Sequence, residues 1–218
     1  MPDDRQRQDR LLVGQRQGLL IVLSGPSGVG KGEILKRARA RLDGFVQVVE
    51  SISATTRQPR PDETDGVQFH FRSREEFEAM RLRGEFLECA EYVGNLYGTP
   101  RAWVEQQLRA GRDVVLEIEV QGGLQVRRQC PDAVLVFVLP PSWEELCRRL
   151  EQRRTESREI REQRMTTARR ELAQVREYDY LIVNDRLDDA VEAFVSIVRA
   201  EHCRARRQNL GFLGPQPY

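Results

Sequence analysis

The sequence predicts an α/β fold in which helices cover both faces of a central parallel sheet. Two observations indicate this fold. Short apolar runs typical of buried parallel strands alternate along the chain with longer amphipathic stretches typical of helices. The first apolar run, at residues 19–23, leads through a glycine-rich turn directly into a helical stretch. Right-handed crossovers between such strands leave a ligand crevice at the carboxyl ends of the strands.

The core elements follow from this alternation, and they give a sheet of four or five strands. Ser142 is followed by Glu145 three residues later, which is the spacing of a capping box at the start of a helix. Strands are expected at residues 19–23, 45–52, 114–118, 133–139 and 180–183, and helices at residues 31–42, 101–110, 142–153, 165–177 and 187–206.

Residues 53–99 differ in composition from the rest of the chain. Proline, glycine, threonine, arginine and aromatic residues surround one short amphipathic helix, expected at residues 73–83 and capped by Ser73 with Glu76. We interpret this segment as a lobe inserted into the core. Residues 153–164 are almost wholly charged, and we interpret them as a mobile cover rather than a linker between domains.

The chain is expected to form one domain with a tail at each end. Its 218 residues, of which 39% are hydrophobic, suffice for one sizeable core. Residues 1–17 are polar and aperiodic, and they predict a flexible N-terminal tail, with a C-terminal tail at residues 207–218. The domain at residues 18–206 divides into a core at 18–52, 100–152 and 165–206, a lobe at 53–99 and a lid at 153–164.

Composition excludes several classes of function. The net charge of +1, from 35 basic and 34 acidic residues, gives no overall attraction to nucleic acid or to an anionic membrane. The longest apolar run, at residues 133–141, is too short to span a bilayer, and residues 1–17 lack a signal-peptide core. The four cysteines and two histidines lack the spacing of a zinc site. We expect a cytoplasmic protein without nucleic acid or membrane partners.

Residues 25–31, GPSGVGK, form a glycine loop between the first strand and the first helix. Backbone N–H groups of such a loop converge on phosphate oxygens, and its lysine reaches the outer phosphates. Lys31 and Lys36 are the only lysines among 35 basic residues, so the loop keeps a compact ammonium in an arginine-rich chain. Gly32 and Glu33 follow this lysine, where Ser or Thr normally supplies a hydroxyl to Mg²⁺.

Several further segments accompany the glycine loop in order. They are SISATTRQPRPDETDG, EFLECAEYVGNLYGTP, VVLEIEVQGGLQVR, VFVLPPS and YDYLIVND. Together with LIVLSGPSGVGKG they resemble guanylate kinases, a family of P-loop nucleoside monophosphate kinases, over residues 18–206. The resemblance implies a P-loop three-layer fold with a central parallel sheet, an inserted mixed α+β nucleoside-monophosphate-binding lobe and a short helical lid. It also implies transfer of the γ-phosphoryl group of ATP to GMP, giving ADP and GDP, in purine metabolism and GMP recycling.

The resemblance implies where the phosphoryl donor binds. Relatives in this group carry Gly-Lys-Gly and hold Mg²⁺, the implied cofactor, largely through water and phosphates, so Gly32 is compatible and Glu117 is a candidate to orient the metal-bound waters. Glu33 replaces a usual threonine and has three interpretations: a water-mediated Mg²⁺ contact, a solvent-facing first-turn residue, or a repulsive neighbour of ATP. The implied ATP-binding residues are Gly25, Pro26, Ser27, Gly28, Val29, Gly30, Lys31, Gly32, Glu33 and Asn184.

Four basic residues are implied to act on the transferring phosphoryl group, whose equatorial oxygens gain negative charge during in-line transfer. Two of them, Arg153 and Arg164, bound the charged cover, and they would close over that group while excluding water. The implied catalytic residues are Lys31, Arg57, Arg153 and Arg164.

Guanine presents two adjacent donors, N1–H and the N2 amine, beside the acceptor O6. The resemblance assigns Glu88 and Glu119 to the donors and Ser53 to O6. It assigns the phosphate to two arginines and two tyrosine hydroxyls, one of which is missing because Phe69 stands in its place. Weaker GMP binding is therefore expected. The implied GMP-binding residues are Ser53, Arg57, Arg60, Phe69, Glu88, Tyr97, Thr99, Glu117 and Glu119.

Three departures from the family pattern keep two other functions open. Glu33 and Phe69 stand at or near functional positions, and Arg154 stands where relatives often have glycine. One alternative is a catalytically silent binding module of the same fold, and the other is a same-fold kinase for a different phosphorylated acceptor. The retained loop lysine opposes the first, and the two glutamates oppose the second. The expected partners are ATP and GMP, with dGMP as a further acceptor, while the sequence leaves the oligomeric state open.

Overall fold

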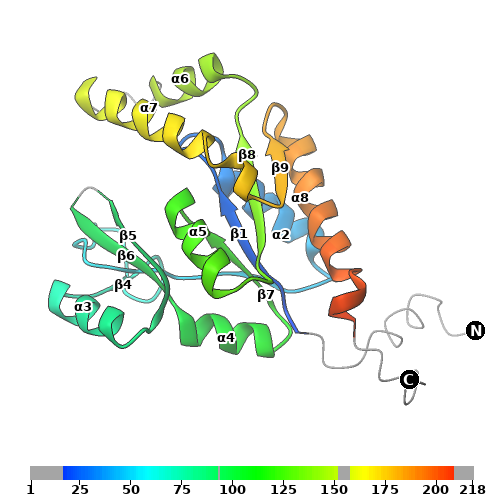
Figure 1. The fold of residues 1–218 in the computed structure, drawn as a ribbon, viewed down its shortest axis with the longest axis horizontal. Helices are drawn as coiled ribbons and strands as arrows, with labels where there is room; N and C mark the ends of the chain where they lie inside the picture. Colours follow the sequence, from blue (N-terminus) through cyan, green and yellow to red (C-terminus); the bar gives the residue numbers. More distant parts are fainter. Residues whose placement is uncertain (1–16, 93, 152–157, 209–218) are drawn as a thin grey trace, which may run out of the picture.

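The computed structural model describes residues 17–92, 94–151 and 158–208, which form two sheets side by side (Figure 1). The core sheet has five parallel strands in the order β2-β7-β1-β8-β9, and the smaller sheet has four strands in the order β4-β3-β6-β5. The core strands are β1 (Leu20–Ser24), β2 (Val48–Glu50), β7 (Asp113–Glu117), β8 (Val134–Leu139) and β9 (Tyr180–Val183). The strands of the smaller sheet are β3 (Ala54–Thr55), β4 (His70–Phe71), β5 (Phe86–Tyr92) and β6 (Asn95–Pro100). The predicted α/β class is confirmed.

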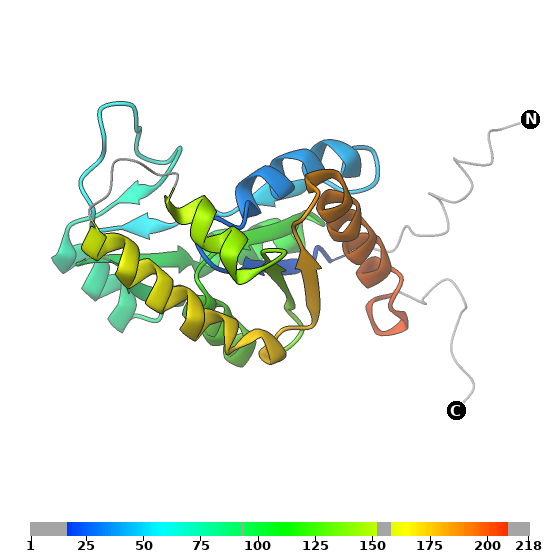
Figure 2. The same cartoon turned by 90° about the horizontal axis from the view of Figure 1, so that it is seen from above.

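Helices cover both faces of the core sheet, as the alternation predicted. One apolar core joins the sheet to α2 and α8 through side chains such as Leu35 and Phe194, and the other joins it to α4 and α5 through Val104 and Val126. The helices α6 and α7 pack against each other above the carboxyl ends of the strands (Figures 1 and 2). The helices of this layer arrangement are α2 (Lys31–Leu42), α4 (Arg101–Arg109), α5 (Val120–Gln129), α6 (Trp143–Glu151), α7 (Arg158–Leu172) and α8 (Leu187–His202).

The smaller sheet has a core of its own. Helix α3 (Arg74–Leu82) packs against this sheet and brings Phe77 onto the ring of Phe86 with centroids 4.5 Å apart, beside the buried Ala54. The predicted capping box at the start of α3 is confirmed, because Glu76 N–H donates to Ser73 Oγ at 3.1 Å and Ser73 N–H donates to the Glu76 carboxylate at 2.8 Å. This small core lets residues 54–100 form a separate wall beside the core sheet.

Helix α5 was not predicted from the sequence, because no element was expected between residues 119 and 132. Gly122 and Gly123 lower the helix propensity of this segment, so the sequence pattern did not indicate a helix there. Tertiary contacts stabilise the helix in the folded protein. A Cβ atom at Gly123 would lie 2.5 Å from Tyr178 Oη, so the helix can approach the sheet this closely only with glycine there. The backbone contact of α5 with β1 and β5 follows from these two residues.

Other boundaries also differ from the prediction. The second core strand is shorter, at Val48–Glu50, because the residues before it form a turn after α2. The helix expected at residues 165–177 begins earlier, at Arg158 within the charged segment, and it ends at Leu172 before a short 3-10 helix, Val175–Glu177. Arginine and glutamate have high helix propensity even where no apolar stripe is present. The apolar pattern therefore predicted too late a start for this helix. Helix α8 ends at His202, four residues before the predicted end at residue 206.

Candidate active site

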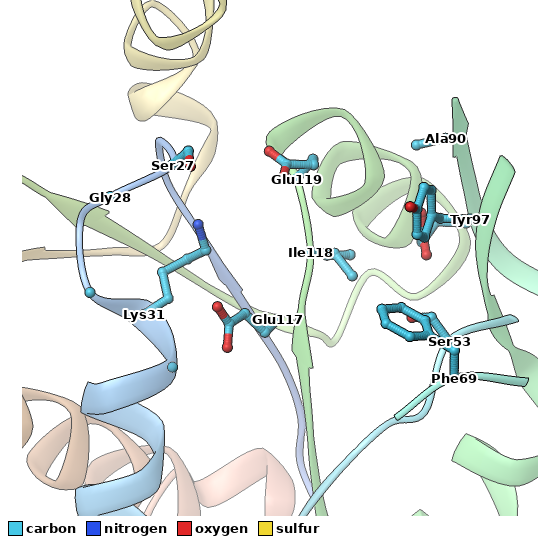
Figure 3. Close-up of a pocket in the computed structure, with 13 residues that line it drawn as sticks. Ser27, Gly28, Lys31, Ser53, Phe69, Ala90, Tyr97, Glu117, Ile118 and Glu119 are labelled. Atoms are coloured by element: carbon cyan, nitrogen blue, oxygen red, sulfur yellow. The ribbon is translucent and has the colours of Figure 1, made fainter. Parts of the chain in front are cut away.

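A cavity of about 550 Å³ separates the glycine loop from the smaller sheet (Figure 3). In Figure 3 the loop, Lys31 and Glu117 lie on one side, and Ser53, Phe69 and Tyr97 lie on the other. The cavity opens at the carboxyl ends of β1 and β7, where the predicted crevice was expected. Its lining residues are Ser27, Gly28, Gly30, Lys31, Gly32, Ser53, Phe69, Glu88, Ala90, Tyr97, Glu117, Ile118 and Glu119.

The glycine loop needs glycine for its shape. Gly25 has a φ of 142°, and a Cβ atom there would lie 2.3 Å from the carbonyl oxygen of Val138 on the neighbouring strand. Gly30 has a φ of 87° and is the N-cap of α2, so the loop leads into the free N–H groups of the helix N-terminus. The Lys31 ammonium donates to the carbonyl oxygens of Gly25 at 2.7 Å and Pro26 at 3.4 Å. These two hydrogen bonds therefore hold the Lys31 ammonium within the curve of the loop.

The Glu117 carboxylate lies close to Gly32, the residue that replaces the usual Ser or Thr. A Cβ atom at Gly32 would lie 3.3 Å from Glu117 Oε2 at the end of β7, so the Glu117 carboxylate lies beside the position where a Ser or Thr side chain would begin. Burial raises the pKa of Glu117, and the positive charge of Lys31 opposes that rise. An oxygen ligand is thus present next to the loop lysine although the hydroxyl is absent.

The back of the loop is held by two side chains from the next elements. Asn184 donates its buried side-chain amide to the carbonyl oxygen of Val29 at 2.7 Å. Arg149 on α6 donates to the backbone oxygen of Asn184 at 3.1 Å and pairs with Glu145 at 2.6 Å. Residues from α6 and the end of β9 therefore fix the loop from outside the cavity.

Glu33 lies away from the cavity. Its carboxylate accepts a hydrogen bond from Arg37 Nε at 2.9 Å, one turn further along α2, and its side chain is 47% exposed. This geometry favours the second of the three interpretations, a solvent-facing residue of the first helical turn.

The opposite wall carries a buried carboxyl group. Glu88 on β5 is only 4% exposed, and Thr99 Oγ1 on β6 donates to Glu88 Oε1 at 2.7 Å. The other oxygen of Glu88 lies against α5, where a Cβ atom at Gly122 would approach it to 2.7 Å. Burial raises the pKa of Glu88, and the bond from Thr99 opposes that rise. Thr99 and Gly122 together fix the direction of this carboxyl group.

A second carboxyl group on the cavity has an acidic partner. Glu119, directly before α5, is in hydrogen-bonding contact with Glu171 of α7, which is 8% exposed. Burial first, and the neighbouring Glu119 second, raise the pKa of Glu171 to about 8. Glu171 therefore keeps its proton at neutral pH, and its contact with Glu119 links the last turns of α7 to the cavity.

Arg57, in the lobe, is held from several sides at the edge of the cavity. Its Nη2 pairs with Glu63 at 2.8 Å, and its guanidinium carbon lies 5.3 Å from the ring centroid of Phe69. The hydrogen bond with Glu63 is the main cause that raises the pKa of Arg57, and a hydrogen bond with Tyr97 raises it further. Arg60 is exposed, and its backbone N–H donates to the same Glu63 carboxylate at 2.8 Å.

The lid helix reaches the glycine loop. Arg164 on α7 donates from Nη1 to Ser27 Oγ at 3.3 Å. Arg153 and Arg154, the other residues singled out in this segment, lie outside the described residues. Within the described ranges, no three His, Cys, Asp or Glu side chains gather in a way that could hold a metal, and no described helix is long and apolar enough to cross a membrane.

Comparison with known proteins connects this geometry to a family. Residues 17–201 match the family model described as guanylate kinase. The chain belongs to the guanylate kinase family. It is 52% identical over 200 residues to the guanylate kinase of Desulfitobacterium hafniense, covering 92% of this chain and 98% of that relative. It is 51% identical over 191 residues to the guanylate kinase of Streptococcus thermophilus, covering 88% and 90%.

A solved structure supports the same assignment. The crystal structure of guanylate kinase from Anaplasma phagocytophilum has a TM-score of 0.71 and 32% sequence identity, over 91% of this chain and 93% of that chain. The resemblance to guanylate kinases and the predicted fold class are thereby confirmed.

The guanylate kinase cavity gathers residues from distant parts of the chain. Eleven of the residues predicted for ATP or GMP line it, and the others surround it or face outward. The predicted residues in the lining are Ser27, Gly28, Gly30, Lys31, Gly32, Ser53, Phe69, Glu88, Tyr97, Glu117 and Glu119. The predicted residues outside the lining are Gly25, Pro26, Val29, Glu33, Arg57, Arg60, Thr99, Arg164 and Asn184.

Three residues of this guanylate kinase site were missed by sequence reasoning. Glu63 and Arg149 follow segments with clear motifs, but each lies among many charged residues of ordinary surface composition. Glu171 belongs to a helix that is charged on all sides, and its partner Glu119 is remote in sequence. The position of Glu63 three residues after Arg60 was the one available local signal.

Proposed function

We propose that this chain transfers the γ-phosphoryl group of ATP to GMP, giving ADP and GDP. The observation that carries the proposal is that one cavity is lined both by the loop lysine, Lys31, and by two carboxyl groups, Glu88 and Glu119. Membership of the guanylate kinase family supports both substrates. The same cavity could hold donor and acceptor together, so direct transfer needs no covalent enzyme intermediate.

The donor phosphates are assigned to the glycine loop. The backbone N–H groups of residues 27–32 bind phosphate oxygens, and Lys31 exchanges its loop carbonyl partners for the outer phosphates. Mg²⁺ fits beside the loop, because the Glu117 carboxylate is a hard oxygen ligand next to Gly32. Glu117 would hold the metal through its waters, and the bound metal would neutralise phosphate charge. Asn184 contributes by supporting Val29 from behind the loop.

The acceptor is assigned to the opposite wall. Glu88, held by Thr99, and Glu119 accept hydrogen bonds from N1–H and the N2 amine of guanine, while Ser53 bonds O6. Adenine lacks this pair of adjacent donors, so AMP would leave the buried carboxyl group of Glu88 without its guanine partner. Contacts limited to the base and phosphate are consistent with dGMP as a second acceptor.

The acceptor phosphate is assigned to Arg57, Arg60 and Tyr97 in the lobe. In-line transfer then places new negative charge between Arg57, Lys31 and Arg164, which neutralise it from three elements. We assign residues 53–99 and 153–164 as the two segments that close over the substrates, with Arg153 in the second. Their closure excludes water and suppresses hydrolysis of ATP.

Cytoplasmic GMP recycling is the setting we propose for this reaction. The four cysteines are free, which suits a reducing compartment. The product GDP carries the guanine of degraded nucleotides back towards the triphosphate pool.

A coupled assay of ADP release with GMP, dGMP, AMP and UMP tests the proposed function. The proposal predicts turnover with GMP, slower or comparable turnover with dGMP, and none above background with AMP or UMP. No turnover with any acceptor would support the silent binding module instead. Turnover only with an acceptor other than a guanine nucleotide would support a different kinase of the same fold.

A further inference from the structure

We propose that Glu63 is a positioning residue, which holds the guanidinium of Arg57 in the orientation that receives the acceptor phosphate. The inference rests on the proposed function, and it adds a residue that touches no substrate itself. Glu63 lies in the loop between β3 and β4, six residues after Arg57. Three sets of contacts restrain Arg57, and Glu63 makes the first of them.

The first set joins the two arginines of TTRQPR. Glu63 Oε1 accepts from Arg57 Nη2 at 2.8 Å, and Glu63 Oε2 accepts from the backbone N–H of Arg60 at 2.8 Å. The side chain of Glu63 is only 9% exposed and that of Arg57 only 20%, so this pair is largely shielded from water. One carboxylate thus fixes the loop that carries Arg60 and the side chain of Arg57 at once.

The second set is aromatic. The guanidinium carbon of Arg57 lies 5.3 Å from the ring centroid of Phe69 and 5.8 Å from that of Phe71. The Phe69 ring also contacts Tyr97 edge-on, with centroids 5.9 Å apart. Cation–π attraction to two rings restrains a guanidinium without using its N–H donors. Phe69 therefore has a place in the site as a platform for Arg57, which needs no hydroxyl.

The third contact is with the backbone. Arg57 Nη1 donates to the carbonyl oxygen of Gln58 at 2.8 Å, whereas the bond to Glu63 is made from the other terminal nitrogen, Nη2. A guanidinium has five N–H donors, so these bonds leave donors for a phosphate. An arginine that is ordered before the acceptor arrives loses less conformational entropy on binding.

Glu63 also has an opposing effect, because its negative charge lies near the position expected for the phosphate. Arg57 lowers the pKa of Glu63, so the carboxylate stays charged at neutral pH. If repulsion of the phosphate outweighed the ordering of Arg57, removing the charge would tighten GMP binding. The buried geometry and the multiple restraints on Arg57 lead us to expect the reverse.

The test compares Glu63→Gln and Glu63→Asp with Asp62→Asn, a control that removes one charge from the neighbouring exposed residue. Calorimetric titrations measure the binding of GMP and of guanosine, which lacks the phosphate, and thermal unfolding checks the fold. We expect Glu63→Gln to weaken GMP binding about tenfold, Glu63→Asp to weaken it less, and Asp62→Asn to change it less than twofold. Guanosine binding should stay within twofold of wild type in all three.

A double-mutant cycle shows whether Glu63 acts through Arg57. In an Arg57→Ala background, Glu63→Gln should cause less than a twofold further loss of GMP binding. Unchanged or tighter GMP binding in Glu63→Gln, an equal loss of guanosine binding, or an undiminished effect in the Arg57→Ala background would each overturn the proposal. Turnover of GMP by the wild type is measured separately, so failure of the proposed function is recognised independently of these titrations. If Glu63→Gln does not fold, Glu63→Asp is judged by the same criteria.

Discussion

The lysine at position 31 and the carboxylate at position 117 form the centre of the donor end. Lys31 is ordered by two loop carbonyls, and a Cβ atom at Gly32 would lie only 3.3 Å from Glu117 Oε2. The Glu117 carboxylate is thus in tight contact with the position where a side chain of residue 32 would begin. This pairing explains how a glycine can follow the loop lysine while an oxygen ligand remains available.

Replacing Phe69 with tyrosine should strengthen GMP binding. The Phe69 ring lines the cavity beside Tyr97, and a hydroxyl on it could donate to the acceptor phosphate. A hydrogen bond to a charged group contributes about 1.5–3 kcal/mol, so Phe69→Tyr should lower the half-saturating GMP concentration by about tenfold or more. Steady-state kinetics at saturating ATP measure this. An unchanged or higher value would show that the ring edge does not face the phosphate.

Replacing Glu33 with threonine should have almost no effect. Glu33 pairs with Arg37 on the exposed face of α2, and exposed pairs of this kind contribute about 0.3–0.5 kcal/mol. The half-saturating ATP concentration of Glu33→Thr should stay within about twofold of wild type. Clearly tighter ATP binding would indicate repulsion in the wild type, and clearly weaker binding would indicate a contact to Mg²⁺.

Single residues were predictable where a local motif defines them. The glycine loop needs no distant partner to be recognised, and Lys31 stands out because lysine is rare in this chain. Glu63 and Glu171 were not predictable, because an isolated glutamate in a charged stretch is normally a surface residue. Only the fold brings Glu171 to Glu119, and only the turn after Arg60 brings Glu63 back to Arg57.

Among the elements, α5 shapes the wall of the cavity that we assign to guanine. Its two glycines allow it to pack against the Glu88 carboxyl on one side and Tyr178 on the other. The sequence signal for strands and for α2 was clear because their buried faces are continuous and apolar. The signal for α5 was weak because close packing required glycines, which are unfavourable in isolated helices.

Adding one methyl group at Gly122 should disturb the acceptor end selectively. The new Cβ would lie 2.7 Å from Glu88 Oε2, so the carboxyl group or α5 must move. We expect Gly122→Ala to raise the half-saturating GMP concentration about tenfold with ATP dependence nearly unchanged, since overpacking costs about 1–3 kcal/mol. The exposed Gln121→Ala on the same helix is the control. Equal GMP kinetics in both variants would contradict the assigned role of Glu88.

For the whole molecule, the contact between Glu119 and Glu171 joins the end of α7 to the cavity. Helix α7 contacts the glycine loop through Arg164 at Ser27 and reaches Glu119 through Glu171. One helix therefore touches both the donor loop and the acceptor wall. The topology that creates this link was predictable only in outline, because it depends on how α6 and α7 cross above the sheet (Figure 2).

The raised pKa of Glu171 should appear as pH-dependent stability. In the unfolded chain this carboxyl ionises near its ordinary value of 4.5, whereas in the folded protein it keeps its proton until about pH 8. The folded state binds more protons between these values, so this group lowers the free energy of unfolding as pH rises from about 4.5 to about 8, by about 1.4 kcal/mol per unit of pKa difference.

Glu171→Gln removes this titration and retains a hydrogen-bond donor for Glu119. The variant should gain unfolding free energy relative to wild type at pH 9 and gain little at pH 5. Urea unfolding at both pH values measures the difference, with the exposed Glu177→Gln as control. An advantage of Glu171→Gln that is equal at both pH values would contradict the raised pKa of Glu171.

The central claim is that one cavity contains two separate nucleotide sites, a loop that binds ATP and a wall that binds GMP. Titration calorimetry of wild type, Lys31→Met and Glu88→Gln with each nucleotide in turn tests it most directly. We expect Lys31→Met to lose ATP binding and keep GMP binding, and Glu88→Gln to lose GMP binding and keep ATP binding. Wild type that binds neither nucleotide at millimolar concentration, or variants that each lose both nucleotides equally, would contradict it.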